Sequence, residues 1–231
     1  IKKNIYRNID VILIIFIATI LTSINSKDIQ ISTIFAASFI VSIILINWAI
    51  PRLNNLKLKQ IIREEGPKSH YKKSNTPTMG GILIIPIGLF IGVIGSKGYF
   101  FNDKLVGILI VSLLYMLIGF IDDWKSHQSK VKKGMSGETK ISLQLVSGII
   151  FLLWCNMKNL ISPEITLIGE KIIDLGLLIW PLTLFVVVAQ SNATNLTDGL
   201  DGLASSCSSL VFTGLSLHLL FEQKSNYMVM A

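Results

Sequence analysis

Four polar side chains recur at every third position between two apolar runs. They are Asn192, Asn195, Asp198 and Asp201. In a helix or a 3₁₀ turn this spacing places two amides and two carboxylates roughly on one strip. Carboxylates in or beside a membrane are costly, so the pattern favours a functional site. The alternative is a polar loop in which Asp caps a helix and Gly turns the chain. A plain loop does not need four regularly spaced polar groups.

The adjacent acids Asp122 and Asp123 form a second candidate site, at the end of the apolar run 105–121. This run is expected to cross the membrane toward the cytoplasm, so the acids lie near the C-terminal end of a helix. The helix dipole disfavours carboxylates there, and adjacent carboxylates repel each other. Both effects call for a compensating cation, and oxygen ligands suit Mg²⁺ held together with substrate phosphates. The alternative is a solvated helix end.

The segment 70–81 is a third candidate. Thr76 and Pro77 predict the N-cap and first residue of the following helix. The free N–H groups and positive dipole end of such a helix attract an anion. Lys72 and Lys73 lie just upstream, and two consecutive glycines allow close approach of a ligand. The segment therefore predicts a phosphate or diphosphate site, against the alternative of an ordinary capped helix flanked by lysines.

The composition is that of a membrane protein. The 231 residues are 51% hydrophobic and 15% charged, with a mean hydropathy of +0.62. Cys155 and Cys207 lie inside apolar runs and are interpreted as buried hydrophobic residues, with no disulfide or metal site. The net charge of +7 does not indicate a nucleic-acid partner, because the basic residues lie between apolar segments.

Several apolar runs approach the roughly 20 residues that a membrane helix needs. We expect an all-α, polytopic helix bundle with about seven spans. The runs lie at about 9–24, 31–50, 78–95, 105–121, 142–157, 172–190 and 203–221. The first run resembles a signal peptide, but no small-residue cleavage site follows it, and we interpret it as a retained anchor.

The distribution of Lys and Arg predicts the orientation. Of the 21 basic residues, about 15 lie before the first run and in the loops 51–77 and 122–141. This asymmetry places both loops, and by alternation the segment 190–202, in the cytoplasm. All three candidate sites then share one membrane face. Acids, amides and lysines gathered there suit transfer of a phosphorylated group, in which a metal neutralises charge and a carboxylate handles the proton or attacks.

Three segments, in this order, resemble the phospho-N-acetylmuramoyl-pentapeptide-transferases (translocase I) of the polyprenyl-phosphate N-acetylhexosamine-1-phosphate transferase superfamily. The resemblance covers about residues 31–221. It rests on Glu65 to His70 with Thr76 to Gly81, on Gly119 to Asp123, and on Asn192 to Ala204. It implies an inner-membrane enzyme of about ten spans with a cytoplasmic active site. The implied reaction uses Mg²⁺ and moves phospho-MurNAc-pentapeptide from UDP-MurNAc-pentapeptide to undecaprenyl phosphate, giving lipid I and UMP in peptidoglycan synthesis.

The resemblance also implies roles for single residues. Asp122 and Asp123 match the family's essential pair, one of which is proposed to deprotonate the lipid phosphate. Asp198 matches an essential acid that acts as nucleophile or binding group. The implied metal ligands are Asp122, Asp123 and Asn195. The implied substrate-binding residues are Lys73, Thr78, Lys125, Lys140, Asn192, Asn195 and Asp201. A homodimer is compatible with the resemblance.

The chain departs from the family pattern in three places. Asn75 stands where the family usually has Gly, and the run 9–24 exceeds the common core. The sequence stops at Ala231, before the later spans, a third essential Asp and a His-rich loop that the resemblance implies. We therefore treat 1–231 as a single integral membrane domain, with its transferase core from about residue 31. We expect it to match the N-terminal two-thirds of such an enzyme.

Three other interpretations compete. A sister transferase would move GlcNAc-1-phosphate from UDP-GlcNAc to the same lipid and would share the acidic pair. An ion-coupled carrier would use its carboxylates as a relay near mid-membrane, whereas the acids here cluster at one face. An inactive, truncated remnant would fold in the membrane without turnover.

Overall fold

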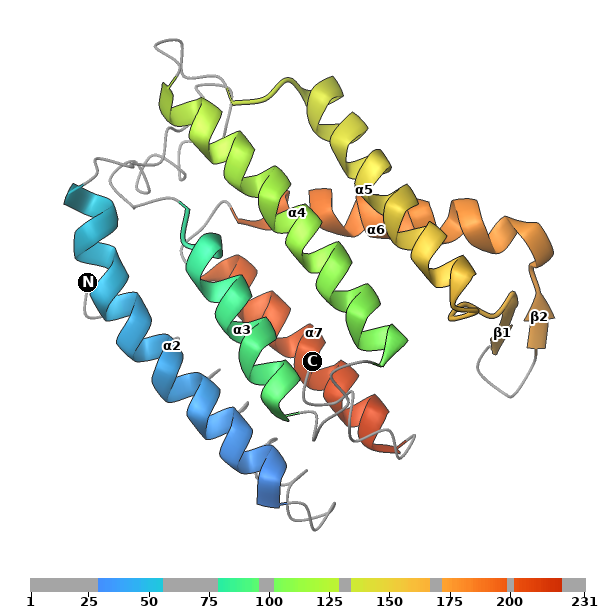
Figure 1. The fold of residues 1–231 in the computed structure, drawn as a ribbon, viewed down its shortest axis with the longest axis horizontal. Coiled ribbons are helices and arrows are strands. Elements are labelled where there is room, and N and C mark those ends of the chain that lie inside the picture. The colour runs from blue at the N-terminus through green and yellow to red at the C-terminus, as the bar shows by residue number, and fades with distance from the viewer. Residues whose placement is uncertain are drawn as a thin grey trace. The chain divides into compact units, whose positions relative to one another are not determined.

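The computed structural model describes residues 29–55, 79–95, 102–128, 134–166, 172–198 and 202–221 (Figure 1). These residues form α-helices, one short 3₁₀ helix and one two-stranded hairpin. The elements are α2 (Ile29–Asn55), α3 (Gly81–Gly95), α4 (Asp103–Gln128), α5 (Gly137–Met157), β1 (Glu164–Thr166), β2 (Ile172–Asp174), η2 (Gly176–Leu178), α6 (Ile179–Thr197) and α7 (Leu203–Phe221). The predicted all-α class is confirmed for this part of the chain, since the only sheet in it pairs two strands of three residues each.

Four of the described helical segments are long and apolar enough to cross a membrane. They are Ala36–Leu53, Asp103–Gln128, Gly137–Met157 and Gly176–Thr197. The apolar helices Gly81–Gly95 and Leu203–Leu219 are shorter, and the predicted run 9–24 lies outside the described residues. Large side chains such as Phe90 and Phe185 are exposed on these helices, as expected where lipid replaces water. Multiple apolar helices are therefore present, while seven spans are not reached among the described residues.

The apolar run 172–190 does not form a helix throughout, which corrects the prediction. Its first residues form β2, in which Ile173 pairs with Ile165 of β1 in antiparallel register. Asp174 then accepts a hydrogen bond at 2.8 Å from the backbone N–H of Gly176, whose φ is +51°. This turn starts η2 and delays α6 to Ile179. The helix instead extends beyond the apolar run to Thr197, so the polar segment 190–202 is helical over its first half.

A further helix boundary differs from the prediction. The acidic pair lies within α4, which continues to Gln128, because charged and polar residues extend the helix beyond its apolar part. The described helix after the third candidate segment starts at Gly81, whereas the predicted cap and first residue, Thr76 and Pro77, lie outside the described residues. Met79 has a left-handed φ of 68°, which interrupts a helix, and its carbonyl accepts from the N–H of Ile82 instead.

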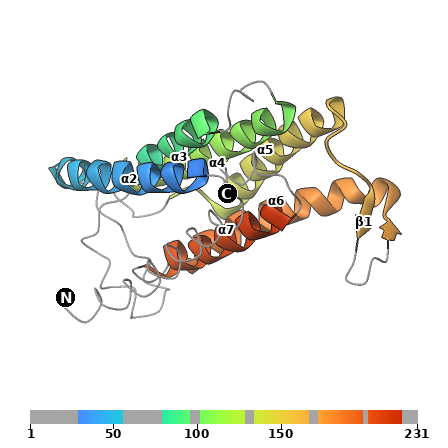
Figure 2. The ribbon, with the colours of Figure 1, turned by 90° about the horizontal axis from the view of Figure 1, so that it is seen from below.

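The described chain divides into two compact units, the second of which runs from Phe101 to Asn195. In this second unit α4 lies beside α5 in both views (Figures 1 and 2). A Cβ atom added at Gly107 of α4 would lie 3.3 Å from the Trp154 ring of α5. One added at Gly148 of α5 would lie only 2.5 Å from the Leu184 side chain of α6. Glycine therefore permits the close approach of α5 to both of its neighbours.

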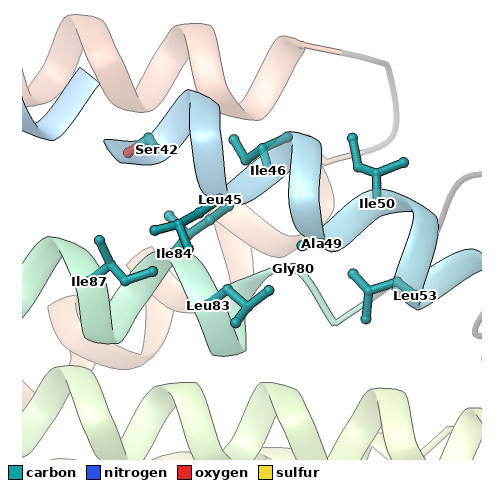
Figure 3. A pocket seen from close by; sticks show the side chains of 10 residues that line it. All are labelled: Ser42, Leu45, Ile46, Ala49, Ile50, Leu53, Gly80, Leu83, Ile84 and Ile87. Atoms are coloured by element: carbon teal, nitrogen blue, oxygen red, sulfur yellow. The ribbon is translucent and has the colours of Figure 1, made fainter. Parts of the chain in front are cut away.

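The first unit contains α2, α3 and α7. A cavity of about 250 Å³ lies between α2 and α3 (Figure 3). Its lining is apolar apart from one hydroxyl and consists of Ser42, Leu45, Ile46, Ala49, Ile50, Leu53, Gly80, Leu83, Ile84 and Ile87. In the second unit Cys155 is buried, as predicted, but Cys207 on α7 is exposed, so the prediction of two buried thiols is wrong for Cys207.

Candidate active site

Asp122 on α4 is held by two different donors. Its Oδ2 atom accepts a hydrogen bond from the Lys140 ammonium at 3.1 Å. Its Oδ1 atom accepts from the backbone N–H of Met135 at 2.8 Å. The ion pair is largely shielded from solvent, since the side chains of Lys140 and Asp122 are 17% and 18% exposed. A carboxylate with both oxygens engaged has one preferred orientation, which is what a proton-transfer or binding group requires.

The segment before α5 lies directly against this carboxylate. A Cβ atom at Gly134 would lie 2.5 Å from Asp122 Oδ1 and 2.6 Å from the Ser126 hydroxyl. Met135, the next residue, is buried. The N-cap Ser136 accepts a hydrogen bond from the N–H of Thr139 at 3.2 Å, which fixes the start of α5. Only glycine fits at position 134 without displacing the carboxylate, so the approach of this segment to Asp122 depends on it.

Lys140 opposes the dipole of its own helix, because it lies in the first turn of α5, where the dipole disfavours a cation. Asp122 lies more than a turn before the end of α4 at Gln128, where the dipole has little effect on an anion. Lys140 thus supplies a positive charge beside Asp122, whereas the compensating cation that the sequence predicts there is Mg²⁺. Helix stability alone would favour an acid at the position of Lys140.

A buried amide continues the polar cluster one turn along α5. Gln144 is 1% exposed. Its Oε1 atom accepts from Asn192 Nδ2 at 2.8 Å, and its Nε2 atom donates to Ser191 Oγ at 3.2 Å and to Asn192 Oδ1 at 3.4 Å. Its backbone carbonyl accepts from the Tyr115 hydroxyl at 3.0 Å. Gln144 thus connects α5 with both α4 and α6.

Two sets of polar contacts, one turn apart on α5, therefore join this helix to α4 and to α6 in the second unit. Together we call them the polar strip, which consists of Asp122, Lys140, Gln144, Ser191 and Asn192. Sequence reasoning proposed Asp122, Lys140 and Asn192 as site residues. The structure joins Asp122 to Lys140, and joins Asn192 to Gln144 one turn further along α5. It missed Gln144, Tyr115 and Gly134. The available signal was a glutamine inside an apolar run, four residues after a lysine.

The remaining predicted site residues are placed as follows. Asn195 lies in the last turn of α6 and is exposed, and Asp198 follows that helix directly. Asp123 is partly buried beside Asp122, and Lys125 is exposed in the last turn of α4. The predicted positions outside the described residues are Lys73, Thr78 and Asp201.

The predicted metal ligands suit magnesium by chemical type. Asp122, Asp123 and Asn195 offer only oxygen to a cation if the amide turns its carbonyl toward it, and Mg²⁺ is usually bound by one or two carboxylates, waters and substrate phosphates. Within the described residues no three side chains of His, Cys, Asp or Glu gather closely enough to hold a metal by themselves. The donor set therefore fits a metal that is shared with a phosphate ligand, and does not fit a closed structural metal site.

Comparison with known proteins gives two family matches. Residues 105–231 match the model described as "Glycosyl transferase family 4". Residues 73–85 match "Phospho-N-acetylmuramoyl-pentapeptide-transferase signature 1", a segment that includes Lys73 and Thr78. The first match covers the whole polar strip and the acidic pair.

Curated relatives carry the same name as the signature. A phospho-N-acetylmuramoyl-pentapeptide-transferase of Prochlorococcus marinus (strain SARG) is 46% identical over 195 residues, or 84% of this chain and 53% of the relative. One of Synechococcus sp. (strain CC9311) is 43% identical over 88% of this chain and 53% of the relative. One of Gloeothece citriformis (strain PCC 7424) is 48% identical over 72% of this chain and 45% of the relative. The chain thus spans about half the length of the curated relatives that it matches. It belongs to glycosyl transferase family 4, in the branch of the phospho-N-acetylmuramoyl-pentapeptide-transferases.

Proposed function

We propose that the protein transfers phospho-N-acetylmuramoyl-pentapeptide from its UDP carrier to undecaprenyl phosphate. The products are lipid I and UMP, in the synthesis of peptidoglycan. Family membership supports this reaction class. The observation that carries the proposal is the Asp122–Lys140 pair, because it is largely shielded from solvent and its lysine opposes the dipole of α5. Such an arrangement is costly for a helix pair and useful for charged chemistry at one membrane face.

The proposed reaction is a phosphoryl transfer. An oxygen of undecaprenyl phosphate attacks the sugar-linked phosphorus of the diphosphate. The bond from that phosphorus to the bridging oxygen breaks, and UMP leaves with that oxygen and its electron pair. The proton of the lipid phosphate passes to a carboxylate of the acidic pair, Asp122 or Asp123. Asp198 is the third proposed catalytic acid, and lies directly after α6.

The other proposed residues bind and orient. Lys140 holds Asp122 in one orientation through its 3.1 Å contact, and its ammonium can also attract a phosphate. Lys73 and Lys125 supply further positive charge for the diphosphate. The proposed contacts to the nucleotide-linked substrate come from Thr78, Asn192, Asn195 and Asp201. Most of the catalytic benefit then arises from positioning and charge stabilisation, as is general for phosphoryl transfer.

Magnesium is the proposed cofactor. Asp122, Asp123 and Asn195 would hold it together with the substrate diphosphate. When bound, it supplies positive charge that stabilises the phosphoryl oxygens and the leaving group. The protein residues would provide only part of its coordination, which agrees with the small number of acidic side chains described near Asp122.

The proposed location is the bacterial cytoplasmic membrane, with the site on the cytoplasmic face. The excess of basic residues in the predicted loops 51–77 and 122–141 supports this orientation. In this proposal, residues 1–231 form one integral membrane domain, and the run 9–24 is its anchor. The lipid bilayer is its surroundings, nucleic acid is not a partner, and a homodimer is the proposed assembly.

The test is UMP release by detergent-purified protein from UDP-MurNAc-pentapeptide, with undecaprenyl phosphate and Mg²⁺. UDP-GlcNAc serves as the parallel substrate, and Asp198→Asn as the inactive control. Because the chain spans about half of its relatives, residues 1–231 are assayed beside a version extended to their full length. Metal-dependent release from the muramyl substrate alone supports the proposal. Preference for UDP-GlcNAc would identify the protein as the sister transferase. If the extended protein releases UMP from neither substrate, the proposed transferase activity is refuted.

A further inference from the structure

The side chain of Gln144 is the most deeply buried polar group described in the second unit. Gln144 belongs to none of the three candidate segments that the sequence analysis identified. It is 1% exposed, in a helix long and apolar enough to span a membrane. A buried amide costs free energy unless its hydrogen bonds are made inside the protein. An apolar side chain of the same size would avoid this cost, so a specific role for the amide is expected.

The side-chain amides of Gln144 and Asn192 each donate a hydrogen bond to the other. Asn192 Nδ2 donates to Gln144 Oε1 at 2.8 Å, while Gln144 Nε2 donates to Asn192 Oδ1 at 3.4 Å and to Ser191 Oγ at 3.2 Å. One hydrogen bond would still permit rotation of the Asn192 amide. Paired contacts to both of its atoms fix that rotation. The Asn192 amide also donates to the Val188 carbonyl of its own helix at 2.9 Å, a contact that does not tie it to α5.

The amide pair lies between two groups of proposed site residues. Along α5, Gln144 follows Lys140 by one turn and therefore shares its face. Along α6, Asn195 follows Asn192 by about one turn on a similar face. Lys140 in turn contacts Asp122 on α4. Gln144 is thus the point at which the helix carrying Lys140 is joined to the helix carrying Asn192.

We propose that Gln144 is a positioning residue for the UDP-linked substrate. It acts through Asn192, whose amide it holds in one orientation together with the turn of α6 that carries Asn195. This role rests on the proposed function, in which Asn192 and Asn195 contact that substrate. Gln144 itself is too deeply buried to touch a ligand.

The proposal predicts a specific kinetic change in Gln144→Met, which keeps the side-chain length and removes the amide. The KM for UDP-MurNAc-pentapeptide should rise about tenfold, the fold-change that corresponds to one lost hydrogen bond. The kcat should stay within about threefold, since a lost binding contact acts mainly on KM. Simple loss of folded protein would have the opposite signature, because it lowers the apparent kcat and leaves KM unchanged.

Two further variants separate positioning from stability. Leu152→Ala removes a buried apolar side chain from the same helix and lowers the thermal unfolding midpoint without touching the amide pair. Its KM should equal that of the wild type. Gln144→Glu keeps the acceptor for Asn192 Nδ2 but, when ionised, cannot donate to Asn192 Oδ1 or Ser191, so its KM should lie between those of the wild type and Gln144→Met.

The experiment measures KM, kcat and unfolding midpoint for these variants in the UMP-release assay, with the full-length protein. A KM increase in Gln144→Met that Leu152→Ala does not share supports the role. A wild-type KM in Gln144→Met, or an equal increase in Leu152→Ala, overturns the role while the proposed function stands. If the wild-type protein releases UMP from neither UDP-linked substrate, the proposed function fails and the role of Gln144 fails with it.

Discussion

The two ends of the α4–α5 pair each carry an ion pair, and the two pairs are built differently. At one end Lys158 contacts Asp103 at 3.0 Å, with side chains 37% and 44% exposed. At the other end Lys140 contacts Asp122 at 3.1 Å, with side chains 17% and 18% exposed. The separations are nearly equal, so the distance between the charges does not distinguish a structural pair from a functional one.

The surroundings of the two pairs do distinguish them. Asp103 begins α4 and Lys158 caps α5, so both charges agree with the helix dipoles. Lys158 also lies 5.2 Å from the centre of the Trp154 ring, and the Trp154 indole donates to the Asp103 carbonyl at 3.0 Å. At the Asp122 end, Lys140 opposes the dipole of α5, and Asp122 lies too far inside α4 to gain from a helix end. One end therefore stabilises the helix pair, while the other end gives up part of that stability to orient a carboxylate.

The largest difference between the ends is expected on removing one negative charge from each. Asp122→Asn should lower the kcat of UMP release at least 100-fold, because a positioned proton-transfer group typically contributes about 10²–10⁴-fold. Asp103→Asn should change kcat less than about twofold, because the contacts of Asp103 join α4 to α5 away from the polar strip. Steady-state kinetics of both variants, at equal folded protein, measure the contrast. Equal losses in the two variants would contradict the functional assignment of the Asp122 end.

The next largest effect is expected at the lysine beside Asp122. Lys140→Met should lower kcat/KM roughly 10- to 100-fold, because a charge-assisted hydrogen bond is lost while the N–H of Met135 still supports the other carboxylate oxygen. Lys140→Arg should recover part of the activity, since it restores the charge with a different donor geometry. An Arg variant as inactive as the Met variant would show that charge alone is not what Lys140 supplies.

A smaller loss is expected from crowding the carboxylate through the backbone. Gly134→Ala places a methyl group close to Asp122 Oδ1 and Ser126 Oγ, at 2.5 and 2.6 Å. Misplacement of the carboxylate should lower kcat about tenfold, and crowding should cost about 1–3 kcal/mol of stability. The matched control is Gly137→Ala, because nothing lies within 4 Å of a Cβ atom there. If the control loses as much activity, the close contact at position 134 is not the cause.

The smallest effect is expected at the other end. Lys158→Met should leave KM and kcat unchanged and cost at most about 1 kcal/mol of unfolding free energy, as for partly exposed pairs. The measurement is thermal unfolding at low salt and at about 1 M salt, where screening should remove most of the wild-type advantage. A change in substrate KM in this variant would mean that the two ends are coupled.

The sequence predicted the residue types of the site better than their partners. The acids at 122 and 123, and the polar residues of 192–198, were recognisable because costly side chains interrupt apolar runs. Their contacts join residues 18 and 48 positions apart, which depend on how three helices align. Local patterns carry no information on that alignment, and so Gln144 was not proposed.

Helix boundaries were missed for a related reason. Hydropathy marks the part of a helix that suits lipid, whereas hydrogen bonding continues the helix into polar residues, as in α4 and α6. The hairpin was hidden because Ile172 and Ile173 are apolar enough to extend the neighbouring run. The turn at Asp174 and the short helix η2 separate these two residues from α6.

The amide pair also sets an order of events during synthesis. Gln144 leaves the ribosome before Asn192, which follows it by 48 residues. At about 5–20 residues per second, the glutamine waits about 2–10 seconds for its partner. During that time α5 has no Asn192 to satisfy its amide within the bilayer. The hydrogen bonds between the Gln144 and Asn192 amides can therefore form only when α6 arrives, so the two helices reach their final contact together.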